Sequence, residues 1–129
     1  ADYDAEVAVL GCLLLDMGQF DAAPKIFSLL TAEDFHRDKH KWVFEACHAL
    51  YQAKVPLDLV TVAAELQRHH LLEPCGGSPF LAHCITQTPT SIHAEYYARI
   101  VLARAEERAR VSNQPRREPA HKGYRGLVR

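Results

Sequence analysis

The sequence lacks a hydrophobic run long enough to cross a membrane. Its longest run, residues 7–15, has nine residues, whereas a helix that spans a bilayer needs about 20 apolar residues. Asp2, Asp4 and Glu6 precede this run, where a secretory signal would carry basic residues. We therefore expect a cytoplasmic protein.

Motifs of nucleotide hydrolysis and covalent catalysis are also missing. No Gly-x-x-x-x-Gly-Lys-Ser/Thr loop occurs, and Gly76-Gly77 is followed by Ser78-Pro79, without a lysine that would reach a phosphate. No serine lies in a Gly-x-Ser-x-Gly elbow. We therefore predict no catalytic residue, no cofactor-binding residue and no enzyme activity in this chain.

Metal-ligand spacings are poor despite eight histidines and four cysteines. His36 and His40 are four residues apart but lack the glutamate of a His-Glu-x-x-His motif. Zinc would require the Cys47-His48 and His83-Cys84 pairs to converge in tetrahedral geometry. We expect no metal site and interpret the cysteines as reduced, buried thiols. A His/Cys metalloenzyme remains a third alternative, and a stoichiometric metal content would support it.

Charge is divided unevenly along a chain of net charge −1. Residues 1–107 hold 8 Lys/Arg and 15 Asp/Glu, whereas residues 108–129 hold 7 Lys/Arg and one acidic residue, Glu118. The acidic body argues against a DNA-binding surface there, because phosphate contacts need clustered cations. We interpret residues 111–129 as a basic disordered tail, and contact between this tail and DNA stays open as an alternative.

Hydrophobic periodicity predicts an all-α fold in one small domain, residues 1–110. Apolar positions recur at helical spacing through most of this range, and proline or glycine separates successive stretches. Thr31-Ala-Glu-Asp34 has the form of a capping box, Asp58 is placed to cap a helix, and Ser78-Pro79 has the form of a helix start. The expected helices are about six, over residues 5–16, 20–30, 38–54, 58–70, 78–88 and 92–110.

Several short segments occur in a fixed order between Ala5 and Val101. They are Ala5-Glu-Val-Ala-Val-Leu-Gly-Cys-Leu-Leu-Leu-Asp16, Asp34-Phe35 with His40 and Phe44, Leu57-Asp-Leu-Val-Thr-Val62, Gly76-Gly77 with Phe80-Leu81, and Pro89-Thr-Ser91 with Tyr96-Tyr-Ala-Arg-Ile-Val101. Together they resemble the N-terminal domain of DnaB-type replicative DNA helicases.

This resemblance implies a compact orthogonal helical bundle whose last helix is like the first arm of a helical hairpin. It also implies a protein-interaction role in DNA replication: helicase oligomerisation, as a dimer or hexamer, and docking of DnaG-type primase or a helicase loader. ATP and Mg²⁺ belong to the family's motor domain, which this sequence does not include. The alternative is a stand-alone replication accessory or regulatory protein that binds DNA through its basic tail.

Four residues are the interaction candidates. Tyr96, Tyr97 and Arg99 are of types enriched at interface anchors, although Tyr97 packed in the core is an equally good interpretation. Phe80 matches an aromatic position that the family associates with primase coupling. The sequence departs from the family at His93, where Asn is usual, and from about residue 111 onward, where the second hairpin arm would begin.

Overall fold

The computed structural model describes residues 2–119, and within them every regular element is helical. In chain order the elements are α1 (Asp2–Leu15), α2 (Ala22–Leu29), the short 3₁₀ helix η1 (Ala32–Asp34), α3 (Asp38–Gln52), α4 (Leu59–Arg68), α5 (Gly77–Thr86) and α6 (Ala94–Ser112). This confirms the predicted all-α class with six α-helices. None of the described helices combines the length and apolar character that a bilayer span requires.

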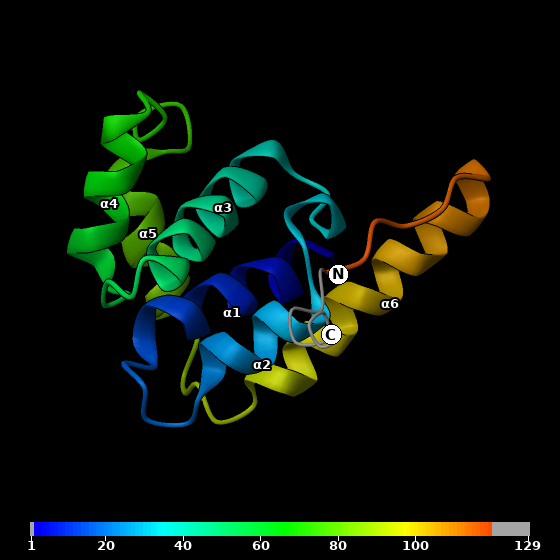
Figure 1. The fold of residues 1–129 in the computed structure, drawn as a ribbon, viewed down its shortest axis with the longest axis horizontal. Helices are drawn as coiled ribbons and strands as arrows, with labels where there is room; N and C mark the ends of the chain where they lie inside the picture. The colour runs from blue at the N-terminus through cyan, green and yellow to red at the C-terminus, as the bar shows by residue number, and fades with distance from the viewer. Residues whose placement is uncertain (1, 120–129) are drawn as a thin grey trace, which may run out of the picture.

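Helix α1 lies at the centre of the molecule and packs against α2, α3, α5 and α6 (Figure 1). Its apolar side chains are buried almost all round, including Val7, Val9, Leu10, Leu13 and Leu14. A helix that is hydrophobic on every side must be surrounded, so the central position follows directly from the composition of this segment. Helices α4 and α5 contact each other, α4 packing on α3 and α5 on α1.

The predicted capping residues act at two helix starts. The Asp34 carboxylate accepts a hydrogen bond from the backbone N–H of Thr31 at 2.8 Å, and Asp58 accepts one from the N–H of Thr61 at 2.9 Å. The predicted start of α5, with Ser78 as the N-cap and Pro79 as the first helical residue, is wrong by two residues. Gly76 takes a φ of 108° and lets the helix begin at Gly77, a conformation that glycine adopts without steric cost.

The C-terminal part of the described chain differs from the expected tail. Helix α6 continues to Ser112, and Asn113 ends it in the left-handed conformation with φ 62°. Residues 113–119, which we call the strap, then turn back toward η1 (Figure 1). The cause is a long-range ion pair, Arg116 with Asp34, which periodicity along the chain does not reveal. The remainder of the expected tail, 120–129, lies outside the described residues.

Candidate functional site

The four cysteines are all free and buried, as predicted. Burial raises the pKa of Cys12 and of Cys84 to about 12, and the nearby Asp16 carboxylate adds to the effect at Cys12. Burial likewise raises the pKa of Cys47. Because the thiolate is the nucleophile and the metal ligand, these groups are unsuited to either task. Across residues 2–119 no three His, Cys, Asp or Glu side chains gather as a metal site would need.

His40 is a packing residue that bonds a buried carboxylate. Its Nδ1 lies 2.6 Å from Oε1 of Glu6, and the second oxygen of Glu6 accepts from the backbone N–H of His36 at 2.7 Å. These bonds join α1 to the start of α3. The arrangement holds two helices together and presents no reactive group to solvent.

The structure places Phe80 in the interior. The side chain is 7% exposed, and its ring stacks on His40 with centroids 5.6 Å apart and an interplanar angle of 9°. Nζ of Lys39 lies 4.4 Å from the ring centroid on the aromatic face, a cation–π contact. A partner that approaches here meets the Lys39 ammonium before the Phe80 ring.

The other three candidates lie together on α6. Tyr96 is 67% exposed, and Ile92, in the turn just before α6, is 52% exposed. Arg99 is exposed and pairs with Glu95, Nη2 to Oε2 at 2.9 Å. Tyr97 is half-buried, and its ring contacts that of Tyr96 at a centroid distance of 6.4 Å. We call Ile92, Tyr96, Tyr97 and Arg99 the α6 face; Phe80, on α5, is not part of it.

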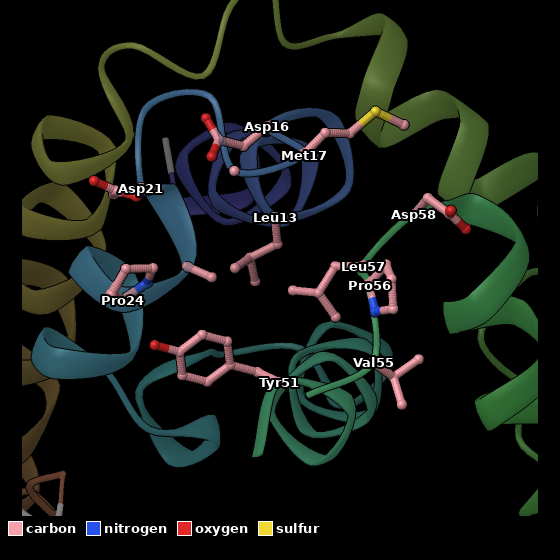
Figure 2. A pocket seen from close by; sticks show the side chains of 12 residues that line it. Leu13, Asp16, Met17, Asp21, Pro24, Tyr51, Val55, Pro56, Leu57 and Asp58 are labelled. Atoms are coloured by element: carbon pink, nitrogen blue, oxygen red, sulfur yellow. The ribbon is translucent and has the colours of Figure 1, made fainter. Parts of the chain in front are cut away.

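An apolar groove of about 540 Å³ lies between the loop after α1, the start of α2 and the α3–α4 connection. Leu13, Pro24, Tyr51 and Leu57 face one another across it (Figure 2). Asp21 and Asp58 lie at its edges. The sequence did not predict this groove, because its walls come from three segments whose relative placement is set only by tertiary packing. Its shape and lining suit an apolar group.

Asp16, at one wall of that groove, joins two loops. It accepts hydrogen bonds from the N–H groups of Phe20 at 3.0 Å and Ala22 at 3.1 Å, and from Oγ of Ser91 at 2.6 Å. Burial raises the pKa of this carboxyl, but the hydrogen bond from Ser91 and those from backbone N–H groups outweigh burial and hold it below its usual value. The ionised form therefore stabilises the fold.

The Asp16→Asn variant is expected to be less stable than the unmodified chain by about 1.5–3 kcal/mol at pH 7, the range for hydrogen bonds to a charged group. Because the folded-state pKa is depressed, the stabilisation is complete above the unfolded-state value of about 3.9 and is lost as pH falls through the folded-state value. Urea unfolding at several pH values should show the difference narrowing below about pH 4. Asp21→Asn is the control, since Asp21 is exposed and makes no side-chain cap bond. A difference that is constant with pH would contradict the assignment.

A second feature that the sequence did not predict is the attachment of the strap to η1. Nε and Nη2 of Arg116 donate to the two carboxylate oxygens of Asp34 at 2.7 and 2.9 Å. Nη2 also donates to the backbone carbonyl of Leu29 at 2.8 Å. The Asp34 carboxylate is thus bound from both sides, by the Thr31 N–H and by a guanidinium. While this pair is formed, Arg116 is engaged and not free to contact a phosphate.

The fold and these surfaces define a small all-helical domain whose distinctive features are exposed faces, grooves and helix-joining polar pairs. Comparison with known proteins identifies the family of this domain. Residues 1–103 match the family model of the DnaB-like helicase N-terminal domain. The chain therefore belongs to the DnaB-like helicase N-terminal domain family, as its marker segments predicted.

Individual relatives agree with the family model. The chain is 43% identical over 104 residues to the replicative DNA helicase DnaB of Mycobacterium leprae, matching 81% of this chain and 17% of that protein. It is 42% identical over 98 residues to DnaB of Geobacillus stearothermophilus, matching 76% of this chain and 21% of that protein. The matched region is thus about a fifth of the length of these helicases.

A solved structure supports the same assignment. The N-terminal domain of DnaB helicase from Mycobacterium tuberculosis superimposes with a TM-score of 0.81 at 42% sequence identity. The match covers 85% of this chain and 76% of that one. The fold described above is therefore that of the helicase N-terminal domain.

Proposed function

We propose that this chain is a protein-interaction domain of the replication machinery, which associates with helicase subunits and docks a DnaG-type primase or a helicase loader. Membership of the DnaB-like family supports a role in DNA replication. On this proposal the chain works in the cytoplasm and needs no cofactor of its own, ATP and Mg²⁺ serving the motor domain of the longer family members.

The observation that carries this proposal is the exposed α6 face. Tyr96 and Ile92 present more than half of their surface to solvent, and Arg99 lies on α6 with Tyr96. Tyrosine and arginine are enriched among residues that dominate binding energy. An aromatic ring with a polar tip gives a large contact area at a low cost in conformational entropy. The face is therefore suited to bind a protein surface.

The Tyr96→Ala variant is expected to bind the C-terminal domain of a DnaG-type primase at least about tenfold more weakly than the unmodified chain, a loss of about 1.4 kcal/mol. The melting temperature should be nearly unchanged, because substitutions of exposed residues usually alter stability by less than about 0.5 kcal/mol. Isothermal titration calorimetry measures the affinity, and a thermal melt measures the stability.

Val60→Ala is the matched control, since Val60 is 72% exposed on α4, away from the α6 face. It should leave primase binding unchanged. If the two substitutions weaken binding equally, the α6 face is not the contact. If the unmodified chain shows no binding to primase, the primase part of the proposal fails, and sedimentation with helicase subunits tests the oligomerisation part separately.

A further inference from the structure

The strap is held by few contacts, and they show what its receiving site recognises. Arg116 is the anchor: its side chain is 12% exposed, and that of Asp34, which it bonds through both carboxylate oxygens, is 1% exposed. This paired geometry suits the planar guanidinium fork, and the single ammonium of a lysine does not reproduce it. The site thus distinguishes arginine from other cations.

The second contact is with the backbone of the strap. Oγ1 of Thr31 donates to the carbonyl of Arg117 at 3.2 Å. Arg117 and Pro119 border a groove of about 270 Å³ whose floor includes Phe27, Leu30 and Phe44. Most of the strap otherwise remains exposed. A short segment is therefore bound through one arginine and one carbonyl, and its Pro119 borders the groove.

The side chain and backbone groups that receive Arg116 are held by contacts that do not involve the strap. Asp34 is oriented by its capping bond to the N–H of Thr31 at 2.8 Å, which lies within η1 and its cap. Arg108 of α6 holds the same turn by donating to the backbone carbonyl of Asp34 at 2.7 Å. All the groups that receive Arg116 fall within residues 1–103, which match the family model, whereas the strap lies outside them.

The groove that adjoins the site is bordered by carboxylates. Glu33 and Glu45 line it; Glu33 precedes Asp34 in the chain and also pairs with Lys41 at 3.5 Å. Phe27 and Phe44 make an edge-on ring contact with centroids 5.1 Å apart and give the groove an apolar floor. A groove with carboxylates at its edges and aromatic rings at its base is suited to bind a segment that contains arginine and proline, as the strap does.

We propose that Asp34, the Leu29 carbonyl and the adjoining groove form a docking site for an extended, arginine-bearing segment of a partner protein, and that the strap is a built-in competitor for it. Because the strap occupies the site within the same molecule, a partner binds only in proportion to the fraction of molecules whose strap is released. The site is separate from the α6 face and does not rest on the function proposed above.

The test uses the whole chain and a fluorescein-labelled peptide of the strap sequence, Asn-Gln-Pro-Arg-Arg-Glu-Pro. Arg116→Ala releases the strap and is expected to bind the peptide at least tenfold more tightly than the unmodified chain, which corresponds to a strap closed in roughly nine molecules out of ten. Arg116→Lys should bind the peptide about as tightly as Arg116→Ala does, because a lysine ammonium cannot form the paired hydrogen bonds of a guanidinium. Fluorescence anisotropy measures the binding.

Arg117→Ala is the matched control: it removes the adjacent arginine but keeps the carbonyl that Thr31 binds, so its peptide affinity should equal that of the unmodified chain. Adding Asp34→Asn to Arg116→Ala should abolish binding. The proposal is overturned if the unmodified chain and Arg116→Ala bind the peptide equally, if Arg116→Ala does not bind it, or if binding survives Asp34→Asn. Concentration-dependent dimers of the unmodified chain that Arg116→Ala loses would make a second copy the occupant and would also overturn it.

Discussion

The Glu6→Ala variant is expected to lose about 3 kcal/mol or more of unfolding free energy, because it removes the acceptor of two hydrogen bonds, and each hydrogen bond to a charged group is worth about 1.5–3 kcal/mol. Glu6 and His40 lie 2.6 Å apart with side chains 2% and 0% exposed. The substitution also removes the acceptor for the His36 N–H. Nε2 of His40 already has no hydrogen-bond partner among the described residues. Without Glu6, neither nitrogen of the buried ring would have a hydrogen-bond partner among them.

Chemical unfolding in urea measures this loss, and a thermal melt should fall by at least about 12 °C, since 1 kcal/mol shifts a domain of this size by about 4 °C or more. Glu6→Gln keeps the shape and one acceptor oxygen, so its loss should be smaller. His69→Ala is the control, because His69 bonds Glu65 at 3.1 Å and its side chain is 53% exposed. Exposed pairs contribute at most about 1 kcal/mol. Equal losses in Glu6→Ala and His69→Ala would show that burial of the first pair is not decisive.

The Gly11→Ala variant is expected to destabilise the fold by about 2 kcal/mol or more. A Cβ at Gly11 would lie 2.0 Å from Oγ1 of Thr88 and 2.4 Å from the carbonyl oxygen of Cys84. The second atom is backbone and does not move without shifting α5. Overpacking costs about 1–3 kcal/mol, and more where backbone must move. The gain in helix propensity from replacing glycine offsets only about 1 kcal/mol of this.

Thr88→Ala tests the assignment of this effect to crowding. By itself it removes the hydrogen bond from Oγ1 to the Cys84 carbonyl, 2.8 Å long, and should cost about 1 kcal/mol. Combined with Gly11→Ala it removes the atom that the new Cβ meets most closely, so the double variant should lose less than the sum of the two single losses. Strictly additive losses in urea unfolding would contradict the close packing of α1 on α5 at Gly11.

The sequence predicted features that depend on neighbours three or four residues away. The cap of α4 at Asp58 and the capping box at Thr31 each join positions i and i+3, so residue type and spacing are enough to find them. The helices follow from apolar periodicity in the same way. The start of α5 shows the limit of such local reasoning. Proline is preferred directly after a capping serine, so the sequence predicted Ser78 as the cap. The left-handed backbone of Gly76 instead allowed the helix to begin at Gly77.

The polar pairs that join distant segments could not be predicted. Asp16 meets Ser91 across 75 residues, and Asp34 meets Arg116 across 82. In the sequence Asp34 is recognisable only as part of a local capping box, and Arg116 lies in a stretch that composition assigns to a disordered tail. Whether a carboxylate finds a partner depends on how the helices cross, which local periodicity does not encode. Phe80 is a related case, because its burial depends on where α3 places His40 and Lys39.

By itself the sequence determined that this protein is all-helical and that it belongs to the DnaB-like helicase N-terminal domain family, through ordered segments that set caps, turns and apolar helix faces. The tertiary structure decided which faces remain open. In the folded chain Phe80 is buried, Tyr96 and Ile92 are exposed, and Arg116 of the strap pairs with Asp34. The physical reason is that hydrophobic periodicity states which side of a helix must be buried, whereas the element that buries it, and the polar groups that meet there, are fixed only by packing.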